Sequence, residues 1–303
     1  MATVRPLNRP RRFSPYRAPR TALAVGVLVL IALTLAGCAG SDRAPYPYHW
    51  NLFFDSIFHP DGAIINGLIL TVTISIAAQV IGVILGIFAA LAKMSKARPI
   101  RWLANTYVWF FRGTPLLVQL VFFYYGLSVA RIYLWPDLAI GPVTIEGAVQ
   151  AGIFVLGVNE GAYMAEIVRA GILAVDPGQM EAARALGMTP GKAMRRIVLP
   201  QAARVIIPPL GNEFNNMLKT TSLLFVLSVV ELYNVFNIKQ GNSFTPFEYY
   251  LAAAVWYLIL TTIWGVIQAW IEGRLAKGAP GASVEGPSFG SRMLGLRGAT
   301  RTH

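Results

Sequence analysis

Residues 176–200 read DPGQMEAARALGMTPGKAMRRIVLP, a polar stretch with long apolar sequence on both sides. The pair Asp176-Pro177 is a typical N-cap followed by proline at the first helical position. Gly187 is a typical residue for ending a helix in the left-handed conformation. The pair Thr189-Pro190 repeats the start signal, and Pro200 indicates the next stop. The stretch therefore predicts two short helices joined by a turn.

The second of these helices carries three basic residues on one face. Lys192, Arg195 and Arg196 are three and four positions apart, so they share a face that suits lipid headgroups. On the first helix, the small residues Ala182 and Ala183 allow another protein surface to approach closely. A helix that lies on the lipid without any partner is the alternative interpretation.

The sequence on both sides of this stretch has the composition of a membrane protein. Of 303 residues, 55% are hydrophobic and 13% are charged, whereas soluble domains carry about 25% charged residues. A membrane span needs roughly 20 apolar residues. We therefore expect an all-α integral membrane protein with about six transmembrane helices. The apolar stretches cover residues 21–39, 64–92, 114–135, 145–172, 205–230 and 247–271.

A helix break is predicted at the start of the third apolar stretch. Pro115 has no backbone N–H and biases Thr114 away from the helical conformation. Residues 101–111, which mix aromatic and polar side chains, would then form an elbow at the membrane surface. A single long tilted helix is the alternative.

Loops rich in Lys and Arg alternate along the chain with loops that contain few, and this alternation predicts the orientation of the chain in the membrane. Residues 1–20 contain six arginines and no acid, and residues 40–63 contain one arginine against three aspartates. By the positive-inside rule both termini should be cytoplasmic. Topology then accounts for the net charge of +12, and a nucleic-acid partner is not expected. The predicted parts are a cytoplasmic leader (1–20), a transmembrane helix (21–39), an extracytoplasmic linker (40–63), the main transmembrane domain (64–275) with its loop (176–203), and a disordered cytoplasmic tail (276–303).

The first apolar stretch has a second interpretation. Leu35-Ala36-Gly37-Cys38 resembles the end of a bacterial lipoprotein signal, in which cleavage exposes a lipid-modified cysteine. We favour a retained span, because small residues before one cysteine arise easily in an apolar helix.

Enzymatic and metal-binding functions have little support. With one cysteine and three histidines, the chain has no ligand set at metal-binding spacing. The G-x-x-x-x-G-K-[ST] phosphate loop is absent, so nucleotide hydrolysis by that route is not expected. No metal or cofactor is predicted.

Several motifs together resemble one family. Glu181-Ala182-Ala183, Gly187 and Ile197–Pro200 resemble the EAA loop of permease subunits of bacterial ATP-binding-cassette (ABC) importers. Segments similar to the polar amino-acid branch, the histidine/glutamine type, are Gly67–Thr71, Arg112–Gln119, Gly161–Ile172, Gly178-Gln179, Pro208–Glu213 and Lys219–Leu223.

This resemblance implies a type I importer fold in the bacterial inner membrane: a five-helix core plus one N-terminal helix. The EAA loop would dock on a cytoplasmic ATPase dimer, which gives a coupling role to Glu181, Ala182, Ala183 and Gly187. The partner ATPase would use ATP-Mg. Further implied partners are a periplasmic or lipid-anchored solute-binding protein and a second permease, either another copy or a homologue.

Polar residues inside the spans predict a transport pathway, since each charge placed there costs roughly 2.5–3.5 kcal/mol. We hypothesise that two polar surfaces line a cavity for a zwitterion, with carboxylates meeting the ammonium group. The residues proposed are Asn159, Glu160 and Tyr163 on one surface, and Asn212, Glu213, Asn216, Lys219 and Thr220 on the other. Lys219 or amide donors would meet the carboxylate.

Other interpretations of these charges remain open. Glu213 could pair with Lys219, and Glu166 with Arg169 at the cytoplasmic interface. An ion-coupled carrier or channel, in which the carboxylates bind the coupling ion, is the alternative function. Within the family, a carboxylate at Glu160 would favour basic amino acids, although the binding protein usually sets selectivity.

Overall fold

The computed structural model describes residues 46–276 together with Val29. The chain divides into the units Met1–Tyr48 and His49–His303, and the helices below belong to the second. The predicted helix at 21–39, apart from Val29, lies outside the described residues. So do Cys38, the leader and nearly all of the tail, and the expectations for them stay predictions.

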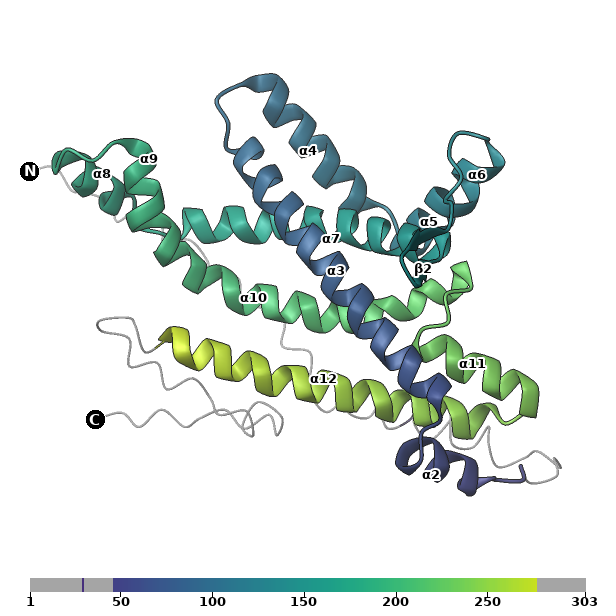
Figure 1. Cartoon of the computed structure of the whole chain (residues 1–303). Coiled ribbons are helices and arrows are strands. Elements are labelled where there is room, and N and C mark those ends of the chain that lie inside the picture. The colour runs from purple at the N-terminus through teal and green to yellow at the C-terminus, as the bar shows by residue number, and fades with distance from the viewer. Residues whose placement is uncertain (1–28, 30–45, 277–303) are drawn as a thin grey trace, which may run out of the picture. The chain divides into compact units, whose positions relative to one another are not determined.

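Among the described residues, three helices are long and apolar enough to cross a membrane: α3 (Gly62–Lys93), α7 (Gly147–Leu173) and α12 (Pro246–Ala276). Two bent helix pairs raise the number to five if each pair is one span. Figure 1 shows these elements gathered into one helical bundle. The predicted all-α membrane fold is confirmed, and the five predicted stretches after residue 60 correspond to these elements.

The predicted break at Pro115 is confirmed. Helix α4 (Arg98–Gly113) and the run Leu116–Val129, made of α5 (Leu116–Val121), the π-helix η1 (Phe122–Gly126) and α6 (Leu127–Val129), meet at an angle of 105°. Gln119 stabilises the bend, because its Nε2 donates to the Phe111 carbonyl at 3.0 Å and to Thr114 Oγ1 at 2.8 Å. The alternative of one long helix is therefore wrong.

The helix after this bend ends at Val129, earlier than the predicted residue 135. Arg131 adopts the left-handed conformation (φ 57°), and the Ile132 N–H donates to the Leu127 carbonyl at 2.9 Å, as in a Schellman-type helix end. A two-stranded antiparallel hairpin follows, with β1 (Leu138–Ile140) paired to β2 (Val143–Ile145). The sequence did not predict this hairpin.

The polar stretch forms α8 (Pro177–Ala185) and α9 (Pro190–Ala193). After α9 the chain continues through η2 (Met194–Val198), α10 (Leu199–Thr220) and the 3-10 helix η3 (Thr221–Leu227). Pro200 was predicted to stop a helix, and that prediction is wrong. The Leu199 N–H donates to Met194 O, five residues back, and this wider π-turn gives the Pro200 ring room beside the preceding turn. Pro208 and Pro209 likewise lie inside α10 rather than before it.

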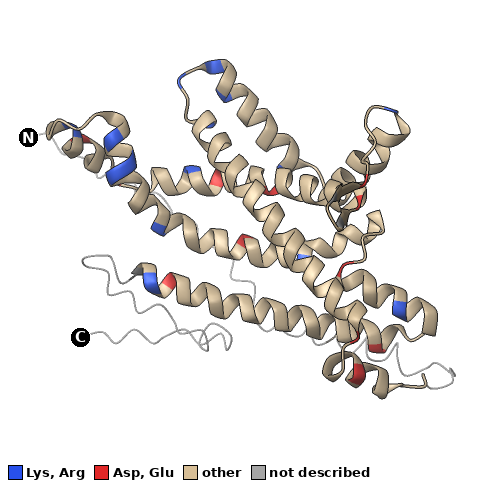
Figure 2. Ribbon diagram, viewed as in Figure 1, with Lys and Arg blue, Asp and Glu red and all other residues tan. Residues whose placement is uncertain are grey.

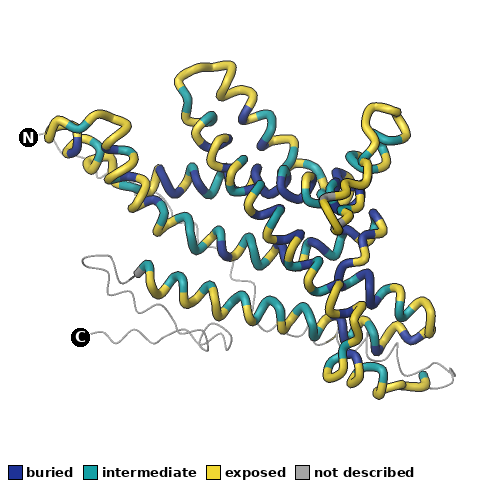
Figure 3. The backbone as a smooth tube through the Cα atoms, in the orientation of Figure 1, coloured by how far each residue is buried: buried dark blue, intermediate teal, exposed yellow. Residues whose placement is uncertain are grey.

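Pairs of glycines allow α3 and α7 to pack closely. Gly82 and Gly86 on α3 and Gly157 and Gly161 on α7 each form a G-x-x-x-G pattern, a common signature of close helix packing in membranes. A Cβ added at Gly86 would lie 2.2 Å from Met164 Cβ, so no larger residue fits without a shift. Figure 3 shows buried backbone along this contact, in the middle of the bundle.

Two further helices complete the described bundle. Helix α11 (Leu232–Ser243) packs against α12, and the Glu231 carboxylate caps its first turn by accepting from the Asn234 N–H at 2.9 Å. Helix α2 (Trp50–Phe58) lies within the segment that the sequence predicts to be a linker.

Candidate functional site

Helices α8 and α9 form a compact projection at one end of the bundle (Figure 1). Asp176 caps α8 as predicted, because its Oδ1 accepts from the Gly178 N–H at 2.8 Å. Gly187 adopts a φ of 79°, and the Met188 N–H closes the turn on the Ala183 carbonyl at 3.0 Å. The predicted helix end is therefore confirmed.

The predicted start of α9 is correct only in part. Pro190 occupies the first turn, but the Thr189 side chain makes no capping hydrogen bond. The Thr189 carbonyl accepts from the Ala193 N–H at 2.9 Å instead. The proline and this backbone bond therefore define the helix start without the hydroxyl.

The four predicted coupling residues differ in exposure. Glu181, Ala182 and Gly187 are exposed, whereas Ala183 is only 4% exposed. Leu186, beside Gly187, is 84% exposed. The projection therefore presents a small surface with one protruding apolar side chain.

Basic side chains gather on this projection. Lys192, Arg195 and Arg196 are all exposed. In Figure 2 the ribbon is blue, the colour of Lys and Arg, on this projection and where α3 joins α4. Two positive segments that are far apart in the sequence thus lie toward the same end of the bundle.

A polar cavity of about 330 Å³ lies between α7 and α10, next to the start of α5. Six of the eight predicted pathway residues line it: Asn159, Glu160, Tyr163, Glu213, Asn216 and Thr220. The other lining residues are Thr114, Leu116, Leu156 and Met217. The two predicted polar surfaces therefore meet at one cavity.

Hydrogen bonds from neighbouring helices hold the α7 side of this cavity. Glu160 is 6% exposed, and its Oε1 accepts from Gln79 Nε2 at 3.3 Å. Asn159 Nδ2 donates to the Phe111 carbonyl and to Gln119 Oε1, both at 3.0 Å. The bend at Pro115 thus positions Asn159, and α3 positions Glu160.

A basic residue that sequence reasoning did not place also lies near the cavity. The Arg112 guanidinium lies 5.2 Å from the centre of the Tyr163 ring, which lines the cavity. Thr114 was likewise missed. The signal was available, since both residues belong to the Arg112–Pro115 motif at the predicted break.

Asn212 and Lys219 do not line this cavity, so their predicted place in it is wrong. A helix turns by about 100° per residue, so Glu213, Asn216 and Thr220 fall within roughly 60° of arc. Asn212 and Lys219 lie roughly 40–60° beyond that arc. Asn212 Oδ1 instead accepts from Gln268 Nε2 on α12 at 3.3 Å. No ion pair joins Glu213 to Lys219 in the described part of the chain.

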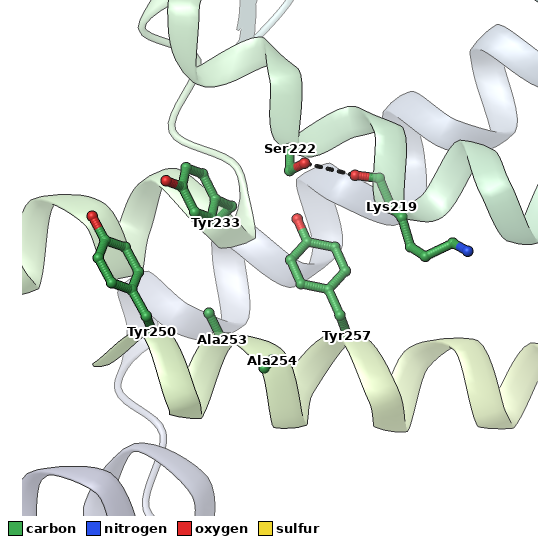
Figure 4. Close-up of a pocket in the computed structure, with 7 residues that line it drawn as sticks. All are labelled: Lys219, Ser222, Tyr233, Tyr250, Ala253, Ala254 and Tyr257. Atoms are coloured by element: carbon green, nitrogen blue, oxygen red, sulfur yellow. Dashed lines mark hydrogen bonds between the residues drawn. The ribbon is translucent and has the colours of Figure 1, made fainter. Parts of the chain in front are cut away.

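Lys219 borders a second cavity of about 480 Å³, between the end of α10 and helices α11 and α12. Three tyrosines line it, and Tyr257 donates from its hydroxyl to Glu231 Oε2 at 2.8 Å. Figure 4 shows the Lys219 ammonium pointing away from the tyrosine rings. The full lining is Lys219, Ser222, Tyr233, Tyr250, Ala253, Ala254 and Tyr257.

Glu166 takes part in an ion-pair network outside both cavities. It pairs with Arg169 at 2.8 Å, as the interface interpretation predicts, and also with Lys93 on α3. This network joins the ends of α3 and α7 next to the projection.

A bundle of long apolar helices with a polar cavity and a capped basic projection defines a membrane transport subunit. Residues 82–277 match the family model described as "Binding-protein-dependent transport system inner membrane component", and the chain belongs to this family. It is therefore an inner-membrane component of such a transport system, and the resemblance to ABC importer permeases is confirmed.

Matches to named relatives and to a solved structure cover most of the chain. The arginine transport system permease protein ArgU of Corynebacterium glutamicum is 37% identical over 276 residues, covering 89% of this chain and 85% of ArgU. The probable amino-acid permease protein YxeN of Bacillus subtilis is 40% identical over 214 residues, covering 71% of this chain and 92% of YxeN. A crystal structure of an amino acid ABC transporter with histidines matches with a TM-score of 0.64 and 40% identity, covering 73% of this chain and 98% of that one.

Proposed function

We propose that this permease forms the membrane pathway for a polar amino acid, and that the cavity between α7 and α10 is where the amino acid binds. The observation that carries the proposal is the placement of Glu160 and Glu213 in one cavity inside the membrane domain. Carboxylates inside a span need a cationic partner or water, and the ammonium group of an amino acid is such a partner.

We further propose that the substrate is a cationic amino acid. Two carboxylates give the cavity one negative charge more than an α-ammonium group neutralises. A basic side chain on the substrate would supply the second cation. Asn216 and Tyr163 offer donors for the substrate carboxylate, and Arg112 adds a positive charge beside Tyr163. The name of the relative ArgU supports this class.

The proposed assembly follows from the position of the positive charges. The α8–α9 projection and the α3–α4 junction face the cytoplasm by the positive-inside rule, which also places both termini inside. A second permease, either a copy or a homologue, completes the pathway, and an external binding protein delivers the amino acid. The chain holds no cofactor in this proposal, and ATP hydrolysis belongs to two separate ATPase subunits that use ATP-Mg.

Coupling is assigned to Glu181, Ala182, Ala183 and Gly187. The exposed residues would contact the ATPase, while Ala183, buried inside the projection, would maintain its shape. The left-handed Gly187 sets the angle between α8 and α9. Closure of the ATPase dimer would then move α10, because η2 joins the projection to α10 without a break.

Purification followed by reconstitution tests this proposal. The tagged chain is purified from its native membranes with whatever binds it, beside a Glu181→Arg, Gly187→Val variant. The wild-type complex is then reconstituted and supplied with arginine, histidine, glutamine and glutamate. We expect an ATPase with the wild type only, and ATP-dependent uptake that is fastest for arginine. A well-folded chain that is consistently alone, with uptake driven by an ion gradient, would contradict the proposal and support an ion-coupled carrier.

A further inference from the structure

Helix α2 is a short element outside the spans, and eight of its nine side chains divide into three groups around the helix axis. With about 100° of rotation per residue, one broad face contains Leu52, Phe53, Ser56 and Ile57. The ninth side chain, Trp50, falls between this face and the next group and contacts Phe247 on α12. Phe54 and Phe58 form an edge beside that face. Asn51 and Asp55 form the next edge.

The broad face is the one packed against the protein. Phe53 and Ile57 contact the apolar cluster between α3, α11 and α12. Two hydrogen bonds fix the helix on α12: the His49 N–H donates to Glu248 Oε1 at 2.7 Å, and Trp256 Nε1 donates to the Ser56 carbonyl at 3.0 Å. These bonds lie near opposite ends of α2, so its rotation about its own axis is set.

The aromatic edge is left open by this packing. Phe54 and Phe58 are 50% and 70% exposed, and their rings stack with centroids 6.2 Å apart. The neighbouring edge is polar, since Asn51 and Asp55 are exposed. Around the helix axis, the face packed against the protein is therefore followed by the aromatic edge and then by the polar edge.

The position of α2 along the chain fixes its level relative to the membrane. Helix α3, the longest described span, begins at Gly62, four residues after α2 ends, and Asp61 caps it by accepting from the Ile64 N–H at 3.0 Å. Asp61 also pairs with Lys239, and its side chain is half exposed. Such a charged pair belongs at headgroup level, so α2 lies at the membrane boundary. In Figure 1 this is the end of the bundle opposite α8 and α9.

We propose that α2 is an interfacial helix whose aromatic edge, Phe54 and Phe58, inserts into the lipid surface. Its polar edge, Asn51 and Asp55, then faces water. Phenyl rings at the headgroup boundary beside a polar helix edge are the usual arrangement of such helices. The two rings, 50% and 70% exposed, offer roughly 200–300 Å², well below the roughly 800 Å² per partner of a stable protein interface. A lipid surface therefore fits this edge better than a protein does.

Spin-label accessibility tests this placement. The full-length chain, with Cys38→Ser as background, carries Phe54→Cys or Phe58→Cys, with Asp55→Cys and Asn51→Cys as matched controls. The labelled proteins are reconstituted in vesicles of phosphatidylethanolamine and phosphatidylglycerol, and collisions with oxygen and with the water-soluble NiEDDA are compared. We expect an oxygen-to-nickel ratio several-fold higher at positions 54 and 58 than at 51 and 55.

Two results would overturn the placement. A high nickel accessibility at 54 and 58 would put this edge in water. Low accessibility to both reagents would mean that protein covers it, for example the binding protein, a second permease or residues 1–45 of this chain. Position 58, the more exposed of the two, decides the outcome if the Phe54→Cys protein does not assemble.

Discussion

Gln79 on α3 donates a hydrogen bond from its Nε2 to Oε1 of Glu160 on α7, at 3.3 Å. The Gln79 Oε1 atom has no partner in the described structure, so the amide is oriented as a donor toward the carboxylate. Beside it, a Cβ added at Gly82 would lie 2.5 Å from Glu160 Cγ. The position of the cavity carboxylate therefore depends on the close packing of α3 against α7.

Replacing Gly86 tests that packing. Gly86→Val places side-chain atoms where Met164 Cβ already lies, at 2.2 Å from the added Cβ. Overpacking of this kind costs about 1–3 kcal/mol, so we expect a lower unfolding temperature in detergent. Gly273→Val on α12 is the control, because an added Cβ there meets nothing within 4 Å. Equal unfolding temperatures for the two variants would contradict the packing argument.

Replacing Gly187 tests the coupling turn. An added Cβ at Gly187 meets nothing within 4 Å, but its φ of 79° is strained for a β-branched residue. Gly187→Val should leave membrane insertion intact and reduce uptake per ATP hydrolysed. Gly187→Asn, which tolerates the left-handed conformation, should retain most of the coupling. The measurement is the ratio of uptake to ATP hydrolysis in proteoliposomes. An unchanged ratio of uptake to ATP hydrolysis in the valine variant would show that the turn at Gly187 has no role in coupling.

Replacing Glu166 tests its structural role. Glu166→Gln removes the charge that faces both Lys93 and Arg169, and Lys93 is mostly buried. The loss of charged hydrogen bonds costs roughly 1.5–3 kcal/mol, so the unfolding temperature should fall. Glu181→Gln, on the exposed projection, should leave it unchanged. If both variants unfold at the same temperature as the wild type, the Glu166 network adds no stability.

The Asp61–Lys239 pair predicts a pH dependence. The pKa of Asp61 lies below its usual value, mainly because the Asp61 carboxylate accepts a hydrogen bond from Lys239. A lowered folded-state pKa means that the pair stabilises the fold above the unfolded pKa of about 3.9, and that this contribution is lost as pH falls through the lowered value. Asn caps helices as well as Asp does, so Asp61→Asn isolates the charge.

We therefore expect the free energy of unfolding of Asp61→Asn to lie below that of the wild type from pH 7 to pH 5, by less than about 1 kcal/mol because the pair is partly exposed. The difference should begin to shrink near the unfolded pKa of about 3.9 and vanish once the pH is below the lowered folded-state pKa of Asp61. Thermal unfolding at a series of pH values measures the difference. A gap that widened on acidification would contradict the assigned direction of the pKa shift.

Local signals in the sequence were enough to predict the spans after residue 60, the cap at Asp176, the turn at Gly187 and the bend at Pro115. Each depends on the apolar length or backbone chemistry of adjacent residues. Pro200 was misread because whether a proline stops a helix depends on the preceding turn, and here that turn is a π-helix.

The candidate cavity was predicted only in part for a similar reason. Spacing on α10 placed Asn212 and Lys219 near Asn216, but only the packing of α7 and α12 decides which side of α10 faces the cavity. The role of Arg112 also depended on a neighbour far away in the sequence, the Tyr163 ring.

Equilibrium binding of labelled arginine to the purified complex of this chain and its ATPase tests whether the cavity beside Glu160 binds the amino acid. Glu160→Gln removes a charged partner worth roughly 1.5–3 kcal/mol, so it should raise the Kd about tenfold to a hundredfold. Glu166→Gln, which lies outside the cavity, should leave the Kd unchanged. An unaltered Kd in Glu160→Gln, with normal folding and ATPase binding, would contradict binding of the amino acid at this cavity.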